Sequence, residues 1–381
     1  MSAADVLART GPRKLLAVDG GGLRGLIAIE VLREVERQLQ EAAGADDTFV
    51  LADYFDYIAG TSTGAMVATG LALGMRVSTL HAFYLEGSRK LFQPSRPWQR
   101  LQHRYRHEWL AATLRELIGV ETTLGSDTLR TLLLLIMRNA STNSPWPLSN
   151  NPNARYNQGP ASNLELRLWQ LVRASTAAPV YFSPEVITVG PKRFVFVDGG
   201  VTVYNNPAFQ LFLMATAEPY RLGWETGTER MLLVSVGTGV DPQANADLQP
   251  GQMNLLYSAT SVPAALMSGA LHEQDLLCRM FGDTRHGDRL DSEVGDLRGV
   301  RGPGDAKLFS YLRYNAELSR AGLDRLGLPG IRPEQVQPLD AIGSVPELEA
   351  VGRALATLVT PEHFAGFAPK WGDLPARTEP R

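Results

Sequence analysis

Two short glycine-rich segments near the start of the chain carry residue types suited to acyl transfer. Residues 60–64 read Gly-Thr-Ser-Thr-Gly and fit G-x-S-x-G, the turn that presents a nucleophilic serine between a strand and a helix. Residues 19–25 read Asp-Gly-Gly-Gly-Leu-Arg-Gly, a loop of backbone amides of the kind that can hold an oxyanion. Together they supply a nucleophile, Ser62, and an anion-binding loop, which are most of an acyl-transfer site.

The first glycine segment has a specific use in this interpretation. Gly20, Gly21 and Gly22 let the backbone approach a ligand closely and can turn successive N–H groups in one direction, and Arg24 would add a positive charge. Asp19 fits a structural role, because a carboxylate directed into an oxyanion site would oppose the bound charge. Two other interpretations remain: a sharp turn without a ligand, and a nucleotide phosphate loop. The phosphate loop is disfavoured because the Gly-Lys-Ser/Thr ending is absent.

A serine hydroxyl needs a base to remove its proton. A Ser–Asp–His order is formally open, since every histidine follows Ser62: His81, His103, His107, His272, His286 and His363. None of them ends a strand-like run, whereas Asp198 does, with Gly199 and Gly200 directly after it. Partial desolvation there would raise the pKa of Asp198 and make it a stronger base. The alternatives are ordinary turn roles for both Ser62 and Asp198.

Strand-like apolar runs lead into the glycine turns, and helical periodicity follows the first two. The predicted strands are Lys14–Val18, Phe55–Ala59, Phe194–Val197 and Met231–Val236. Strands that alternate with helices predict an α/β fold, here a three-layer α/β/α sandwich with a mainly parallel central sheet. Ligands of such sheets gather at the carboxyl ends of the strands, so the four glycine turns are expected along one edge.

The chain divides by pattern into four parts. Residues 1–13 are expected to be a tail, residues 14–240 a catalytic core, residues 241–368 a helical extension that packs on the core and could regulate it, and residues 369–381 a second tail. Within the extension, residues 345–364 predict one amphipathic helix with apolar residues on a shared face: Leu348, Val351, Leu355 and Leu358.

Composition excludes several classes of function. The net charge is only −3, which gives no general attraction to a nucleic acid polymer. The single cysteine, Cys278, excludes an internal disulfide framework and a cysteine-rich metal site, and no H-E-x-x-H motif is present, so we expect no metal or cofactor. The start of the chain lacks a signal-peptide pattern, and no apolar run reaches bilayer length. These features predict a soluble cytoplasmic protein that meets a lipid substrate at the inner membrane face.

A basic segment, residues 92–107, has no acidic residue and three open interpretations. Its arginines are Arg96, Arg100, Arg104 and Arg106, interspersed with Trp98 and Tyr105. They could bind lipid headgroups or a phosphate-bearing messenger. The aromatic residues could instead belong to a lid over an acyl pocket, or the segment could be a solvated surface loop.

The ordered set of motifs resembles the signature blocks of patatin-like phospholipases. Arg173–Phe182, Asn205–Pro207 and Val234–Gly239 resemble the family as well, so the resemblance extends from about Lys14 to Gly239. It implies a Ser–Asp dyad without a catalytic histidine. Carried over by motif position, the nucleophile is Ser62 and the base is Asp198. The oxyanion site is Gly20, Gly21, Gly22 and Arg24, and the supporting glycines are Gly60, Gly64 and Gly199. Ala65, where many members have glycine, is a conservative departure.

The resemblance implies hydrolysis of membrane phospholipid esters, of phospholipase A type, through an acyl-enzyme. Residues 308–315 and 339–364 also resemble bacterial patatin-like effectors of cyclic-oligonucleotide anti-phage signalling. This second resemblance implies a cyclic nucleotide activator and a role in antiviral defence. The alternatives are a constitutive esterase or lipase of general lipid degradation, a histidine-dependent esterase, and a non-catalytic lipid-binding or storage protein on the same fold.

Overall fold

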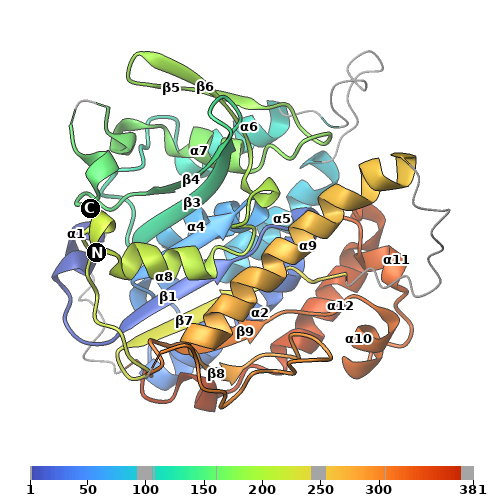
Figure 1. Ribbon diagram of the computed structural model, residues 1–381. Helices are drawn as coiled ribbons and strands as arrows, with labels where there is room; N and C mark the ends of the chain where they lie inside the picture. Colours follow the sequence, from blue (N-terminus) through green and yellow to red (C-terminus); the bar gives the residue numbers. More distant parts are fainter. Residues whose placement is uncertain are drawn as a thin grey trace.

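A nine-stranded sheet lies at the centre of the computed structural model, which describes residues 2–91, 105, 108–159, 161–241, 255–304 and 306–369 (Figure 1). Its strands are β1 (Arg13–Val18), β2 (Tyr57–Thr61), β3 (Leu132–Asn139), β4 (Ser144–Ser149), β5 (Glu185–Val189), β6 (Lys192–Asp198), β7 (Met231–Val236), β8 (Asp283–His286) and β9 (Ser310–Tyr314). The basic segment predicted to bind lipid or phosphate lies outside the described residues, apart from Tyr105.

Helices cover both faces of this sheet, which makes the predicted three-layer α/β/α sandwich. They are α1 (Ala3–Ala8), α2 (Gly25–Ala43), α3 (Leu51–Tyr54), α4 (Thr63–Ala72), α5 (Val77–Leu91), α6 (Glu108–Ile118), α7 (Leu168–Ser175), α8 (Ala208–Thr216), α9 (Leu255–Phe281), α10 (Arg320–Arg325), α11 (Pro333–Val336) and α12 (Val345–Ala356). None of the helices in the described part of the chain has the length and apolarity to cross a membrane.

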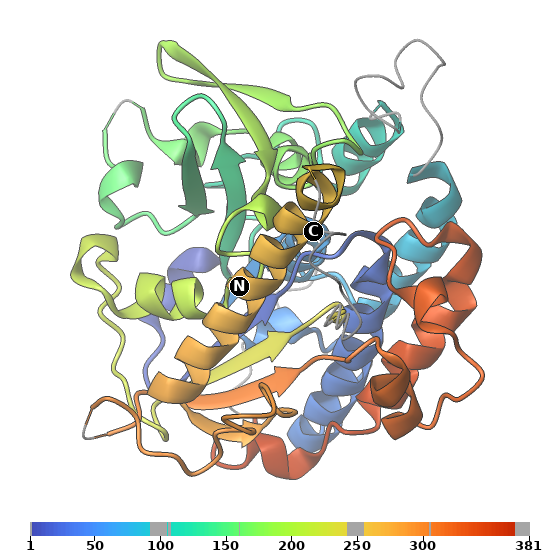
Figure 2. The ribbon, with the colours of Figure 1, turned by 45° about the vertical axis from the view of Figure 1, so that its right-hand side comes forward.

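Two hydrophobic clusters separate the layers. Alternate residues of β3 point to opposite faces, as strand geometry requires: Leu133 and Leu135 join one cluster, and Leu132 and Leu134 join the other. Helices α2, α4, α5, α6, α7 and α12 pack on the first face, and α1, α8 and α9 on the second. Figure 2 shows α9 lying across the sheet, with α2 and α12 on the other side of it. The buried apolar area on both faces fixes the sheet as the rigid element that positions the site.

The strand order is β5-β6-β3-β2-β1-β7-β9-β8, with β4 paired to β3 outside this path. From β3 to β8 along that order all neighbours are parallel. The β3–β4, β3–β6 and β5–β6 pairs are antiparallel. The sheet is therefore mainly parallel, as predicted, with an antiparallel margin that the sequence analysis did not anticipate.

The antiparallel direction of β6 brings two strand ends face to face. On one edge of β3, β2 ends with Thr61 opposite Ile136, and β6 arrives from the other direction and ends with Asp198 opposite Met137. Strand β4 pairs with both Ile136 and Met137 on the opposite edge. The residue after β2 and the last residue of β6 therefore meet along the same edge of β3.

The structure corrects three expectations about the parts of the chain. The presumed helical extension contributes two strands, β8 and β9, to the same sheet, so residue 240 does not bound the core. The presumed first tail contains α1, whose Val6 is buried against the sheet. The predicted helix over residues 345–364 ends at Ala356, and Leu358 lies beyond it, 37% exposed.

Candidate active site

Ser62 occupies a sharp turn between β2 and α4. Its backbone has φ 54° and ψ −121°, a conformation that non-glycine residues adopt rarely and that is typical of a nucleophile turn. A Cβ on Gly60 would lie 2.0 Å from the carbonyl oxygen of Gly64, and a Cβ on Gly64 would lie 2.2 Å from that of Val18. The turn is tight enough to exclude any side chain at both glycines.

A hydrogen bond from the backbone of Ser62 fixes the turn against α7. The Ser62 N–H donates to Ser175 Oγ at 2.9 Å, and that hydroxyl donates to the Ile136 carbonyl of β3 at 2.5 Å. Ser62 also precedes the first residue of α4, so the positive end of the helix dipole faces it. The side chain is partly exposed, which leaves its hydroxyl accessible to a substrate.

Asp198 accepts the hydroxyl hydrogen of Ser62. Ser62 Oγ donates to Asp198 Oδ2 at 2.5 Å, and the Gly200 N–H donates to Asp198 Oδ1 at 2.6 Å. The backbone N–H of Asp198 donates to Ala177 at 3.0 Å, which fixes the residue further. A Cβ on Gly199 would lie 2.4 Å from the Ile136 carbonyl oxygen, so this glycine lets β6 end close against β3.

The surroundings of Asp198 tune its basicity. Burial raises the pKa of Asp198 to about 6, although the hydrogen bonds from Ser62 and Gly200 and the charge of Arg173 all lower it. Asp198 is 3% exposed. A carboxylate with this pKa is ionised at neutral pH and is a better proton acceptor than an exposed aspartate.

The rate of ester hydrolysis should therefore depend on pH through Asp198. Below about pH 6 the carboxyl is protonated and cannot accept the Ser62 proton, so kcat/KM is expected to fall about tenfold per pH unit and to level off above pH 7. Initial rates on a soluble ester from pH 4.5 to 8 would measure this. Arg173→Gln is expected to move the acid limb to higher pH, since its charge lowers the pKa of Asp198. A rate that stays constant to pH 4.5 in folded protein would contradict the assignment.

The predicted oxyanion loop lies beside Ser62. A Cβ on Gly20 would lie 3.2 Å from Ser62 Cβ, and the Gly20 N–H donates to the Asn205 carbonyl at 3.1 Å. In the described part of the chain, the N–H groups of Gly21 and Gly22 have no protein acceptor. Of the three amides predicted to bind an oxyanion, Gly21 and Gly22 are thus available, and Gly20 is used to hold the loop.

The side chain of Arg24, predicted to add a positive charge for the oxyanion, makes one hydrogen bond in the described part of the chain. Its Nη1 donates to the Gln337 carbonyl at 3.3 Å, and its Nε is buried without a hydrogen-bond partner. Burial lowers the pKa of Arg24 to about 10, a shift opposed by the nearby Asp241, so the guanidinium remains charged at neutral pH. The hydrogen bond ties Arg24 to the C-terminal part of the chain.

The C-terminal part of the chain also contacts the loop directly. The Leu23 N–H donates to the Leu339 carbonyl at 2.8 Å. Gly22 has φ 59°, and a Cβ there would lie 2.4 Å from the same oxygen. Tyr105 donates to Asp340 Oδ2 at 2.6 Å and stacks on Tyr181. Residues 337–340 therefore lie directly against the predicted oxyanion loop.

The described histidines take no part in this arrangement. His81 lies between two glutamates, His272 is near Asp291, and His286 and His363 pack against one another beside Tyr314. Ser62 Oγ has Asp198 as its hydrogen-bond partner. Among the described residues, the geometry thus favours a carboxylate over a histidine as the base.

Glu30, His81 and Glu349 bring together three side-chain atoms, one nitrogen and two oxygens, of the kinds that bind metal ions. His81 Nε2 lies 3.2 Å from Glu30 Oε1 and 2.9 Å from Glu349 Oε1. Arg33 contacts Glu30 at 2.6 Å, and Arg353 lies 3.9 Å from Glu30 and 3.8 Å from Glu349. Because arginines already supply positive charge to both carboxylates, we interpret the cluster as ion pairs that fasten α12 to α2.

The sequence analysis assigned no role to several residues that hold the site. Thr238 donates to the Gly20 carbonyl at 2.7 Å, and Arg313 donates to both oxygens of Asp19. Thr238 belongs to a segment that resembles the family, as do Asn205, Arg173 and Ser175, and that resemblance is the signal that could have marked them. Arg313 lies in a segment noted only for its likeness to signalling effectors.

The fold and these residues define an α/β protein with a serine–carboxylate pair at a strand-to-helix turn, beside a glycine-rich loop with two available amides. The family model described as patatin-like phospholipase matches residues 16–212, slightly more than half of the chain. The chain belongs to this family, which confirms the family predicted from its motifs.

Three relatives illustrate the similarity. The cGAMP-activated phospholipase of Escherichia coli (strain TW11681) is 31% identical over 244 residues, which cover 62% of this chain and 65% of that protein. The cGAMP-activated phospholipase of Vibrio cholerae is 32% identical over 208 residues, 51% of this chain and 56% of that protein. Patatin-like protein 4 of Arabidopsis thaliana is 30% identical over 245 residues, 59% of either chain. The chain matches less than two thirds of the length of each of these relatives.

Proposed function

We propose that the chain is a serine acyl hydrolase of phospholipase A type, with Ser62 as nucleophile and Asp198 as base. The observation that carries this proposal is the 2.5 Å hydrogen bond from Ser62 Oγ to the buried Asp198 carboxylate, at a strained turn beside the free Gly21 and Gly22 amides. A nucleophile, a base within hydrogen-bond reach and donors for an oxyanion are the three groups that acyl transfer requires.

The first half of the reaction forms an acyl-enzyme. Ser62 Oγ attacks the ester carbonyl carbon while its proton passes to Asp198 Oδ2, and the carbonyl oxygen becomes an oxyanion that the Gly21 and Gly22 amides stabilise. Each such donor is typically worth about 3 kcal/mol in the transition state. The tetrahedral intermediate then collapses, the carbon–oxygen bond to the alcohol breaks, and Asp198 returns the proton to the departing alkoxide.

The second half of the reaction releases the fatty acid. Asp198, again ionised, accepts a proton from a water molecule that attacks the acyl carbon. The second tetrahedral intermediate uses the same amides, and the proton on Asp198 returns to Ser62 Oγ as the acid leaves. No step needs a histidine, because one carboxylate can accept and return the proton in both halves.

We propose membrane phospholipids as the substrate and peripheral action at the inner face of the membrane from the cytoplasm. The family and the relatives named as phospholipases support this substrate class. The exposed part of Ser62 and the absence of a membrane-spanning helix in the described residues are compatible with approach from the water phase.

We further propose that a cyclic nucleotide switches the activity on and that the enzyme serves anti-phage defence. Two relatives at 31% and 32% identity are named cGAMP-activated phospholipases, and their similarity to this chain supports the same form of control. The constitutive lipase is the alternative, and it differs in one measurable property, the rate without a nucleotide.

Fatty-acid release from phospholipid vesicles tests both proposals. Wild-type protein, Ser62→Ala and Asp198→Asn would each be assayed alone and with a panel of cyclic dinucleotides that includes cGAMP. We expect the wild type, and neither variant, to release fatty acid. The wild-type rate should rise at least tenfold when one of the nucleotides is added. Equal release with every nucleotide and with none would reject activation and leave a constitutive lipase. Binding of vesicles without release of any fatty acid would favour a lipid-binding protein.

A further inference from the structure

A buried arginine on β9, two strands from β1, forms an ion pair with Asp19, the first residue of the predicted oxyanion loop. Arg313, on β9, donates from Nη1 to Asp19 Oδ1 at 3.0 Å and from Nη2 to Asp19 Oδ2 at 2.6 Å. Its Nη1 also donates to Ser235 Oγ on β7 at 2.7 Å. Asp19 and Arg313 are 2% and 3% exposed. Asp19 and Arg313 thus form a buried, bidentate ion pair.

Arg313 stays charged in spite of its burial. Burial alone would lower the pKa of Arg313, but the Asp19 carboxylate outweighs that effect and raises the pKa. A buried ion pair of this kind adds little to stability compared with well-packed apolar residues, because both charges lose their hydration. Stability alone therefore explains poorly why β9 presents an arginine to Asp19.

The position of Asp19 at the start of the oxyanion loop gives the ion pair a role other than stability. Asp19 lies between β1 and Gly20, so its carboxylate determines how the chain leaves the sheet and enters the loop. The Asp19 N–H donates to the Val236 carbonyl at 3.0 Å, so β7 holds the backbone of this residue and Arg313 holds its side chain. Other supports act further along: Asn205 binds the N–H of Gly20, Thr238 binds its carbonyl, and Leu339 holds Leu23.

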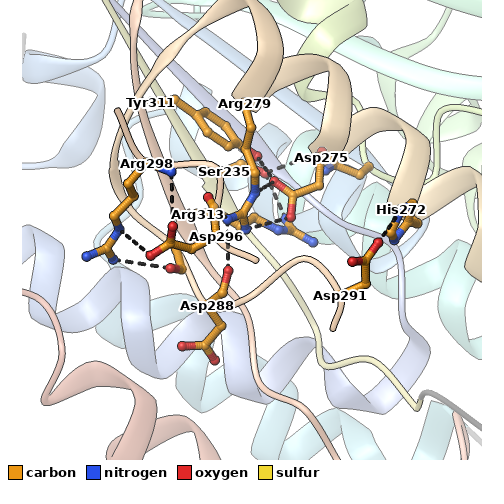
Figure 3. A network of polar contacts seen from close by, with 12 residues as sticks. Ser235, His272, Asp275, Arg279, Asp288, Asp291, Asp296, Arg298, Tyr311 and Arg313 are labelled. Atoms are coloured by element: carbon orange, nitrogen blue, oxygen red, sulfur yellow. Dashed lines mark hydrogen bonds and ion pairs between the residues drawn. The ribbon is translucent and has the colours of Figure 1, made fainter. Parts of the chain in front are cut away.

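A polar network that reaches α9 lies close to Arg313. Figure 3 shows Arg313 and Ser235 close to Tyr311 and to the pair formed by Asp275 and Arg279. Tyr311 donates to Asp275 Oδ1 at 3.0 Å, and Arg279 donates to both oxygens of Asp275 at 3.0 and 2.8 Å. The charge of Asp275 also favours the ionised form of Arg313. The hydrogen bonds to Asp19 and Ser235 therefore orient the guanidinium, and the nearby Asp275 supports its charge.

We propose that Arg313 is a positioning residue for the reaction: its two-pronged contact with Asp19 fixes the direction in which the Gly21 and Gly22 N–H groups face the developing oxyanion. This inference rests on the proposed serine hydrolase function. It assigns a role in the chemistry to a residue outside the region that the family model matches. Arg313 touches neither substrate nor Ser62, and it acts through the loop.

The test compares Arg313→Lys and Arg313→Met with Arg130→Lys, a control that weakens the ion pair of Arg130 with the buried Asp53, outside the polar network around Arg313. Lysine keeps the charge but loses the fork. Rates on a p-nitrophenyl ester would be measured with the activator if the wild type needs one. We expect kcat to fall about tenfold for Arg313→Lys and about 10²-fold for Arg313→Met, with KM within twofold, because one oxyanion donor is worth about 10²–10³ in kcat. Arg130→Lys should keep kcat within threefold.

A second readout separates alignment of the loop from general loss of structure. A trifluoromethyl ketone forms a tetrahedral adduct with Ser62 and needs the oxyanion donors, so its affinity should fall in proportion to kcat/KM across the series. Unchanged affinity for the ketone, a rise in KM alone, or an equal loss in Arg130→Lys would overturn the inference. If Arg313→Met fails to fold, Arg313→Lys decides the matter by the same two readouts. Wild-type protein that neither hydrolyses esters nor reacts with a fluorophosphonate at Ser62 would instead overturn the proposed function, and the inference with it.

Discussion

Replacement of Asp198 by asparagine is expected to lower the rate of ester hydrolysis by about 10⁴-fold, the loss typical of removing a member of a nucleophile–base unit. Asparagine preserves the shape of the side chain and can still accept the Gly200 N–H, but it cannot take the Ser62 proton. Ser62→Ala is expected to lose at least as much, because no acyl-enzyme forms. Initial rates on a soluble ester, with the activator present if the enzyme requires one, measure both losses.

The double variant provides the sharper form of this test. Residues that act as one unit lose activity non-additively, so Ser62→Ala combined with Asp198→Asn should be no slower than Ser62→Ala alone. Asp53→Asn is the matched control, since Asp53 is also a buried carboxylate with an ion-pair partner, Arg130. A loss below tenfold in folded Asp198→Asn would show that another group is the base. Alanine at His272, His286 and His363 in turn would then test the histidine alternative.

Replacement of Gly21 by alanine is the second change for which we expect a large effect. The added Cβ would lie 2.0 Å from Thr238 Oγ1 and 2.5 Å from its Cβ, so the loop or Thr238 must move. Either movement redirects the free Gly21 amide. We expect kcat to fall about 10²–10³-fold, the loss measured when one oxyanion donor is removed, with a much smaller change in KM.

Gly330→Ala is the control for this loop variant. Nothing lies within 4 Å of the Cβ that it would add, and Gly330 lies outside the positive-φ region, so its kcat should match the wild type. Thermal unfolding of both variants would check that the loop variant is folded. A folded Gly21→Ala protein with wild-type kcat would remove Gly21 from the oxyanion site.

The sequence predicted the parts of the fold that local pattern determines. Short apolar runs that end at glycines became β1, β2, β6 and β7, and the interruption by glycine is what separates such strands from helices. β3 was missed, although it begins with six apolar residues in succession, because an uninterrupted apolar stretch fits a buried helix equally well. β9 was missed because a buried arginine makes its sequence resemble a surface segment.

The sequence could identify the serine and the aspartate but could not say how they meet. Strand direction is a tertiary property, and the contact depends on β6 running antiparallel along the edge of β3 that β2 leaves free. The supports of the oxyanion loop include Arg313, Thr238, Asn205 and Leu339, and the last two act through backbone carbonyls that leave no trace in residue type. The partner of Arg24 could not be predicted for the same reason, since it is a carbonyl more than 300 residues away along the chain.

The distribution of the site along the chain has a consequence for synthesis. The serine and the aspartate are both present once residue 198 has been translated, but the contacts at Asp19 and Leu23 wait for residues 313 and 339. Chains emerge from the ribosome at about 5–20 residues per second, so this interval lasts on the order of ten seconds. During that time Ser62 is present in the growing polypeptide, but the oxyanion loop lacks its contacts with Arg313 and Leu339. The proposed hydrolase thus completes the contacts of its oxyanion loop only after residue 339 has been made.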